Sequence, residues 1–365
     1  MKISIGSKAI PGPYGGGNAF LINLKKYFEE QGHVVINHLN DNDIDIILIT
    51  NPLIDSETST FNNFDVSNYI TFINSECLVF QRINECDERK DTNKINSRLD
   101  RYNKYVDINI YVSKWIQNVF SNYEMSNKES YVVRGGPNEN IFNVEDRLFW
   151  NKKEKIKIVT HHWSSNWMKG FDVYEYIDKL ISQKKYKDFM EFTYIGNVPA
   201  KFSFKNSNVV SPIESFELAK ELKRHHIYIT ASKNEPSGNH HMEGAMCGLP
   251  IMYIESGGLP EYCNKFGVQF SLSTFEESLN KIIENYEDLC KKLEDYPFTF
   301  TAAANDYLNI FETSLVRKYE IIERRNLNSK IFVKFEYFKN RIIKSLYFAN
   351  VFAKKNLSRF KKRKK

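Results

Sequence analysis

The stretch ITASKNEPSGNHHMEGAMCGLPIMYIESGGLPEYC, residues 229–263, is the part of this chain that most clearly indicates its fold and function. It opens with an apolar strand that ends near Ser232, and a short Pro-Ser-Gly turn then leads to a helix that begins near Asn239. Gly248 is expected to end that helix, and Pro250 prevents its continuation. Ligands of a parallel sheet bind at the carboxyl ends of its strands. We therefore expect the strand end and the helix N-terminus to face one crevice.

This junction is suited to a diphosphate and to pairs of hydroxyl groups. The N–H groups and the positive end of a helix stabilise phosphate without a metal ion. Glu243 lies about one turn into the helix, on the face of Asn239, where its carboxylate can accept hydrogen bonds from two ribose hydroxyls. Glu235, at the mouth of the loop, is placed to do the same for sugar hydroxyls. Isolated glutamates are more often solvated acids, but the residues around this pair favour a nucleotide-sugar site.

The rest of the chain alternates strands and helices, in two rounds. A strand, a glycine-rich loop and a helix open it at residues 2–6, 12–17 and 19–33, followed by strand-like runs at 34–36, 45–48, 69–74, 108–113 and 131–133. After the charged stretch 151–155 the pattern restarts, with strands at 155–160, 192–196, 226–230 and 250–254 and helices such as 171–183 and 215–225. Such alternation predicts an α/β fold with two parallel sheets. We predict domains at 1–150 and 151–325, and a C-terminal extension at 326–365.

Length and composition agree with two domains. A chain of 365 residues exceeds the ~250 to 300 residues at which single cores stop growing. Apolar residues make up 42% of it, which is enough for two cores. Its five cysteines are scattered, with no metal-ligand spacing, and are expected to be free thiols in a reducing cytoplasm. No secretory signal and no apolar run of ~18 residues is found, so we expect a cytoplasmic protein.

The formal net charge of +6 belongs to the C-terminal end. Residues 354–365 hold eight Lys or Arg and no acid, which leaves 43 basic and 45 acidic residues before them. A nearly neutral body argues against nucleic acid as a partner. Just before this basic end, the apolar residues Phe335, Phe338, Ile342 and Leu346 recur at helical spacing. The extension is therefore either a helix that lies peripherally on an anionic membrane surface or a packing helix with a solvated basic end.

The stretch 229–263 resembles the donor-site signature of retaining GT-B glycosyltransferases, in the glycosyltransferase family 4 group. That pattern has two glutamates with seven residues between them, followed by small and apolar residues and a later Gly-Gly pair. The matching residues are Glu235, Glu243, Ala245, Cys247, Gly248, Leu249, Pro250, Gly257, Gly258, Pro260 and Glu261. The resemblance implies a GT-B fold, two Rossmann-like domains facing across a cleft. It also implies that Glu235 contacts the donor sugar, that Glu243 contacts the ribose, and that the backbone of Ser237, Gly238, Asn239 and His240 contacts the diphosphate and sugar.

The resemblance extends to the loop after the first strand of the second domain. There the family has an Arg and, five residues later, a Lys followed by Gly, and both cations reach the diphosphate. Lys169 and Gly170 match the second element, but Ser164 occupies the Arg position. His161, His162 or Asn166 are the candidates to replace that Arg. By the same resemblance, Asn197 lies near the base.

The first domain is expected to carry the acceptor. Its glycine-rich loop, residues 12–17, corresponds to the family loop that approaches donor and acceptor, which makes Gly16 and Gly17 donor-site candidates. Many relatives place a His in this domain, yet none lies between His38 and His161. Arg82, Glu85 and Asp87 are the acceptor candidates instead, although such clusters are more often surface salt bridges.

These patterns predict transfer of a sugar from a nucleoside-diphosphate sugar to a hydroxyl acceptor, a glycan or lipid-linked saccharide, with anomeric retention as the family implies. Lys169 and Glu235 are the catalytic candidates, and no metal or cofactor is expected. A context in surface-polysaccharide biosynthesis fits a cytoplasmic enzyme with a membrane-facing extension. A silent sugar-nucleotide-binding or scaffold protein and a GT-B-fold epimerase remain alternatives. A nicotinamide-dependent dehydrogenase is disfavoured because the loop at 11–18 lacks GxGxxG spacing.

Overall fold

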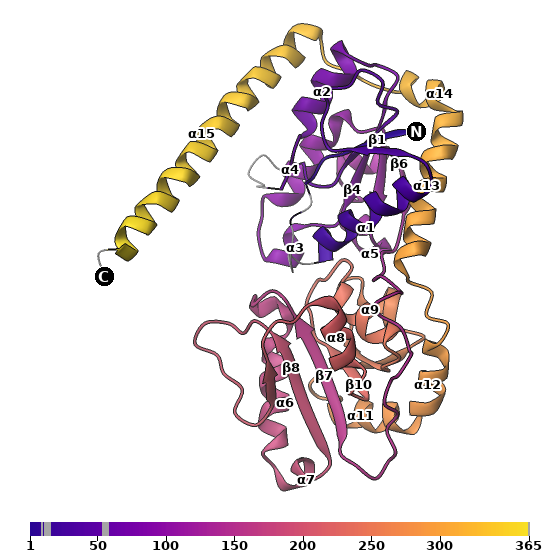
Figure 1. The fold of residues 1–365 in the computed structure, drawn as a ribbon, viewed down its shortest axis with the longest axis vertical. Coiled ribbons are helices and arrows are strands. Elements are labelled where there is room, and N and C mark those ends of the chain that lie inside the picture. The colour runs from indigo at the N-terminus through magenta and orange to yellow at the C-terminus, as the bar shows by residue number, and fades with distance from the viewer. Residues whose placement is uncertain (9, 11–15, 53–57, 364–365) are drawn as a thin grey trace.

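The computed structural model describes residues 1–8, 10, 16–52 and 58–363, with side chains as far as residue 353. In this part of the chain, the strands form two six-stranded parallel sheets, one in each half of the molecule (Figure 1). Apolar side chains are buried on both faces of both sheets. Burial on both faces explains the continuous apolar runs seen in the sequence.

The first sheet has the strand order β2-β1-β3-β4-β5-β6. Its strands are β1 (Lys2–Ile5), β2 (Val34–Ile36), β3 (Ile46–Ile49), β4 (Leu78–Ile83), β5 (Ile108–Tyr111) and β6 (Glu129–Val132). Its helices are α1 (Gly16–Glu30), α2 (Asn63–Phe72), α3 (Asp87–Lys90), α4 (Ile95–Tyr102) and α5 (Lys114–Val119), with short 3-10 turns η1 (Asn103–Tyr105) and η2 (Glu124–Asn127). In register, Ile3 of β1 lies opposite Val35 of β2 and Ile46 of β3.

One predicted strand of this domain is wrong. The apolar run 69–74 belongs mostly to α2, and the strand that enters the sheet is β4. Asn62 caps α2 by accepting hydrogen bonds from the backbone of Phe64 and Asp65, and the Asp65 carboxylate accepts one from Asn62 N in return. This reciprocal cap starts a helix upstream, and the apolar run continues it because Val66, Tyr69 and Ile70 fall on its buried face.

The second sheet has the order β12-β11-β10-β7-β8-β9. Its strands are β7 (Ile156–His162), β8 (Met190–Gly196), β9 (Asn208–Val210), β10 (Ile227–Thr230), β11 (Ile251–Ile254) and β12 (Gly267–Phe270). The turn η3 (Trp167–Lys169) and the helices α6 (Phe171–Ile181), α7 (Lys184–Lys187), α8 (Ser215–Leu222), α9 (Asn239–Met246), α10 (Leu259–Cys263), α11 (Phe275–Glu284) and α12 (Tyr286–Leu293) complete this half. Gly248 follows α9 at φ 80°, as the predicted helix stop requires.

The C-terminal helices return to the first sheet. In α13 (Phe300–Val316), Tyr307 and Phe311 pack against Phe20 and Phe80 of the first core, and α14 (Lys318–Glu323) follows. Figure 1 shows α13 running beside the first domain and α15 (Lys330–Arg363) extending away from the body. The domain bounds 1–150, 151–325 and 326–365 stay a prediction. No helix in the described residues is long and apolar enough to cross a membrane.

Candidate functional site

The strand ends of the second sheet and the start of α9 meet at one edge that faces the first domain. β10 ends at Thr230, residues 231–238 form the loop predicted from sequence, and α9 begins at Asn239. β7, the neighbour of β10 in the sheet, ends at His162 and leads into the loop that carries Lys169. Parallel strands bring their carboxyl ends together. Residues separated by more than 60 positions in the sequence therefore share this edge.

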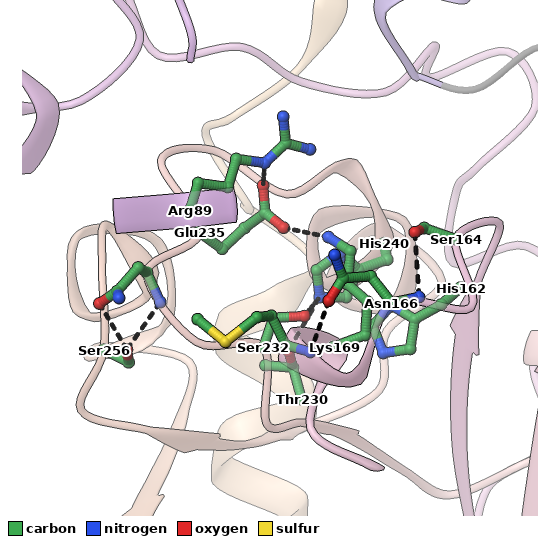
Figure 2. A network of polar contacts seen from close by, with 12 residues as sticks. Arg89, His162, Ser164, Asn166, Lys169, Thr230, Ser232, Glu235, His240 and Ser256 are labelled. Carbon is green, nitrogen blue, oxygen red and sulfur yellow. Dashed lines mark hydrogen bonds and ion pairs between the residues drawn. The ribbon is translucent and has the colours of Figure 1, made fainter. Parts of the chain in front are cut away.

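Glu235 lies at the centre of the site and is 3% exposed rather than open at the loop mouth. Figure 2 shows its carboxylate between Lys169, which donates a hydrogen bond to Oε2, and Arg89 of α3, whose Nε lies 3.3 Å from Oε1. Burial alone would raise the pKa of Glu235, but the two cations reverse this and bring it to about 2. The carboxylate is therefore ionised and paired with a cation from each domain.

Two glycines hold the backbone around Glu235. Gly257 has φ 61°, and a Cβ there would lie 2.4 Å from Glu235 N. Gly170, directly after Lys169, has φ 95°, and a Cβ there would lie 2.4 Å from the Ala231 carbonyl oxygen. Side chains are disfavoured at both positions by conformation and by space. The Gly-Gly and Lys-Gly pairs of the sequence signature thus let three loops approach closely.

Both domains contribute to the start of α9. Gly238 precedes the helix, and no described side chain caps its first turn. Gly16, at the start of α1, faces Asn239 so closely that a Cβ would lie 2.8 Å from Asn239 Nδ2. Around Gly17 there is open space. The remainder of the predicted glycine-rich loop, residues 12–15, lies outside the described residues.

Glu243 is paired within the second domain. Its Oε2 lies 2.6 Å from Nε2 of His161, at the end of β7. Both side chains keep a little exposure, 16% for Glu243 and 10% for His161.

The Tyr262 hydroxyl lies 3.0 Å from Ser237 Oγ and donates to the Val112 carbonyl of the first domain at 2.6 Å. The residues predicted from the signature therefore surround one helix terminus.

His162 and His240, both predicted donor-site residues, lie beneath this terminus rather than on its surface. His162 is 3% exposed and its Nε2 lies 2.8 Å from the Tyr174 hydroxyl, while His240 Nε2 lies 2.8 Å from Thr230 Oγ1. Their ring centroids are 4.6 Å apart. Burial lowers the pKa of both imidazoles well below the ordinary value, so these side chains are neutral supports of the loop.

The loop after β7 is shaped by short polar contacts. Asn166 Oδ1 accepts from Met168 N at 2.9 Å, and Ser164 Oγ accepts from Asn166 N at 3.2 Å. Asn197 is exposed and donates its amide to the Trp163 carbonyl at 2.7 Å. These bonds tie together the two loops that follow β7 and β8 and position Lys169.

The predicted acceptor residues have local partners. The Arg82 guanidinium lies 4.4 Å from the Phe20 ring centroid, and Asp87 accepts hydrogen bonds from the backbone at the start of α4. Glu85 pairs with Arg89 at 3.1 Å and with Lys90 at 2.7 Å. Glu85 connects to Glu235 through Arg89.

Sequence reasoning missed two residues that join the domains. Arg89 follows the acceptor candidates Glu85 and Asp87 in the sequence without a pattern that marks it, and Glu261 is one residue of the matched motif. Glu261 accepts hydrogen bonds from the backbone N of Lys114 and Trp115, at 3.0 and 2.7 Å, and from Arg134 at 2.8 Å. Both contacts span more than 120 residues of sequence, so no local pattern could reveal them.

Other features lie away from this edge. A hollow of about 870 Å³ lies between α2 and α15, lined by residues such as Asp65, Arg341 and Lys344. We regard the paired glutamates and helix terminus, rather than this hollow, as the candidate site because the chemistry converges there. No group of three His, Cys, Asp or Glu side chains in the described part of the chain is arranged to hold a metal ion.

No protein-family model and no curated protein sequence matches this chain. Solved structures match its fold. Sucrose-phosphate synthase from Thermosynechococcus elongatus aligns with a TM-score of 0.64 at 12% identity, over 87% of this chain and 99% of that one. HepE from Anabaena, in complex with UDP and glucose, aligns with a TM-score of 0.60 at 11% identity, over 86% of this chain and 99% of that one.

An α-glucosyltransferase in complex with UDP also aligns, with a TM-score of 0.55 at 11% identity, over 86% of this chain and 100% of that one. At these identities the likeness establishes the fold alone. The chain has the GT-B fold, with two Rossmann-like domains, as the resemblance of residues 229–263 implied.

Proposed function

We propose that this protein is a glycosyltransferase that moves a sugar from a nucleoside-diphosphate sugar to a hydroxyl group of a glycan or lipid-linked saccharide. The observation that carries the proposal is the convergence of Glu235, Lys169 and Arg89 beside the N-terminus of α9. Cations and helix N–H groups together suit a diphosphate. An ionised carboxylate beside them suits the hydroxyl groups of a sugar.

In this proposal each residue has a separate task. Lys169 and the first turn of α9 stabilise the negative charge that develops on the leaving diphosphate. Glu235 orients the sugar, and Glu243 accepts hydrogen bonds from the ribose, with His161 holding its carboxylate at 2.6 Å. His162 and His240 support the loop from below. Asn197 contacts the base through the amide N–H and Oδ1 that its bond to the Trp163 carbonyl does not use.

Arg89 supplies the second cation that the loop after β7 lacks. Ser164 occupies the position where the family pattern has an Arg, and its hydroxyl is engaged by Asn166 N. Arg89 comes from the opposite domain and already lies 3.3 Å from the carboxylate of Glu235. Placing the cation on the first domain couples charge compensation to closure of the two domains.

We further propose that the reaction proceeds with retention at the anomeric carbon. The bond from that carbon to the diphosphate oxygen breaks, and a bond to the acceptor oxygen forms on the same face. The acceptor proton passes to the departing phosphate oxygen, so no protein base is required. Uridine nucleotides are the first donors to examine, because two proteins of similar fold, HepE and an α-glucosyltransferase, have structures with UDP or UDP-glucose.

Turnover of a panel of nucleotide sugars tests this function. Purified protein is incubated with UDP-, GDP- and ADP-sugars, with and without saccharide acceptors, and nucleoside diphosphate release is followed. Proton NMR of the product gives its anomeric configuration. We expect nucleoside diphosphate to be released from the sugars of one nucleotide. We expect Lys169→Ala to slow this release about 100-fold or more.

Lys233→Ala is the matched control, because Lys233 lies on the neighbouring loop but pairs with Asp172 at 2.7 Å. Its turnover should equal that of the wild type. Binding of a nucleotide without any turnover would instead support the silent binding protein.

A further inference from the structure

Among its described side chains, residues 330–353, helix α15 contacts the first domain along one face. Val333 is fully buried and Asn340 is 3% exposed, and Asn340 donates a hydrogen bond to Asn62, the cap of α2, at 3.3 Å. Lys334 lies 4.4 Å from the centroid of the Phe72 ring, at the end of α2. The rest of the helix extends away from the body (Figure 1). Its orientation is therefore fixed by α2, and its opposite face is left open.

The opposite face carries a continuous stripe of large apolar side chains. Ile331, Phe335, Phe338, Ile342 and Leu346 follow one another at steps of four, three, four and four residues, which places them on one side of a helix. Each of them is between 55% and 85% exposed. We call these five residues the outer stripe. Isolated exposed apolar residues are ordinary, but five large ones along one face of a helix are expected to contact a partner.

Cations flank the outer stripe. Lys330, Lys334 and Arg341 lie on one side of the helix and Lys339 on the other, by their positions in the helical repeat. The last acid of the chain is Glu336, which is 19% exposed and pairs with Lys339 at 3.1 Å. The sequence after it adds only basic charges, including eight between residues 354 and 365.

This charge pattern favours lipid over a second copy of the chain. Two such helices packed stripe to stripe would bring Lys and Arg against Lys and Arg, without acids to neutralise them. An anionic lipid surface suits both the cations and the apolar stripe. Its headgroups neutralise the flanking cations, and the apolar side chains enter the boundary between headgroups and acyl chains.

We propose that α15 docks the protein on an anionic membrane surface through the outer stripe. The helix lies in the plane of the interface with α2 and the first domain above it. This surface is separate from the proposed sugar-transfer site, and docking would bring the acceptor domain to the membrane.

Vesicle sedimentation of the full chain tests the proposal. Wild type should sediment with phosphatidylcholine vesicles that contain phosphatidylglycerol and stay in solution with phosphatidylcholine alone. The triple variant Phe335→Ser, Phe338→Ser, Ile342→Ser removes exposed side chains without touching the α2 contact. We expect its vesicle affinity to fall by at least about tenfold. Ile342→Ser alone should have a smaller effect, which guards against a folding defect in the triple variant.

Phe216→Ser is the matched control, because Phe216 on α8 is 65% exposed and lies in the other domain. It should bind vesicles as wild type does. Light scattering of each protein in solution gives its molar mass and so distinguishes monomer from dimer. Equal vesicle binding by wild type and the triple variant would overturn the proposal, as would a failure of wild type to bind. A wild-type dimer that becomes monomeric in the triple variant, without vesicle binding, would show that a second copy covers the stripe.

Discussion

At the scale of single residues, the site depends on a balance of charge around Glu235. A carboxylate that is almost fully buried is normally driven towards its neutral form. Lys169 and Arg89 reverse that tendency and hold the pKa of Glu235 at about 2. Since its folded pKa lies below the ordinary value, this carboxyl contributes stability at neutral pH that is lost as the pH falls towards 2.

Arg89→Ala tests the role of the cation from the first domain. Removing it leaves Glu235 with Lys169 as its cation partner, so the pKa of Glu235 should rise and the leaving diphosphate should lose one positive charge. We expect kcat/KM for the nucleotide sugar to fall about tenfold or more.

Lys90→Ala is the control for Arg89→Ala. Lys90 is the next residue, is 51% exposed and pairs with Glu85 rather than Glu235. Equal kcat/KM values for Arg89→Ala and wild type would remove Arg89 from the donor site.

The buried histidines predict how stability depends on pH. Burial lowers the pKa of His241 to about 3 and that of His226 to about 4. Below pH ~6.5 the unfolded chain binds protons that the folded imidazoles do not, so the free energy of unfolding should decrease as the pH falls from about 6.5 to about 4. Thermal unfolding of His241→Gln over this range should show a smaller decrease than wild type.

His38→Gln is the comparison, because the His38 side chain is 42% exposed. Its stability should fall with pH as steeply as that of wild type. A slope in His241→Gln as steep as that of wild type would contradict the account of this buried imidazole.

At the scale of elements, local signals predicted the strand, turn and helix of residues 229–263 better than they predicted the strands of the first domain. The strand, turn and helix of residues 229–263 are found as predicted, because Gly248 and Pro250 mark the helix end unambiguously. The run 69–74 looked like a strand because it is apolar and strand-length. The Asn62 cap starts helix α2, which takes up most of this run, and the strand that joins the sheet is β4, further along the chain.

Glu261 joins α10 to the start of α5 in the other domain. Its carboxylate accepts two backbone N–H bonds there and a bond from Arg134. Glu261→Ala should lower stability by roughly 1 to 2 kcal/mol, as loss of a helix cap does. It should also increase the radius of gyration in small-angle scattering, because a link between the domains is lost.

Glu217→Ala removes a carboxylate of the same type from an exposed pair with Lys220, where Glu217 is 65% exposed. We expect a change of at most about 0.5 kcal/mol and no change in radius. If Glu261→Ala matches this control in both measurements, the link does not hold the domains together.

At the scale of the whole molecule, the two parallel sheets could be predicted because each half repeats the same alternation of strands and helices, and the resemblance of residues 229–263 implied their GT-B arrangement. The contacts that complete the site could not. Arg89 meets Glu235 across 146 residues of sequence, and α13 leaves the second half to pack on Phe20 and Phe80 of the first. Such contacts depend on how two finished domains face each other, which residue spacing does not encode.

The central claim is that the edge formed by Glu235, Glu243 and α9 binds a nucleoside-diphosphate sugar. Thermal unfolding of wild type and Glu243→Ala, with UDP, GDP, ADP, CMP and their sugars, tests it most directly. A ligand that binds only the folded state raises the melting temperature, and the rise grows with the logarithm of the ratio of ligand concentration to Kd. We predict a rise with one nucleotide and its sugar that is lost in Glu243→Ala and kept in Glu217→Ala. No rise with any nucleotide, or an equal rise in Glu243→Ala, would contradict the claim.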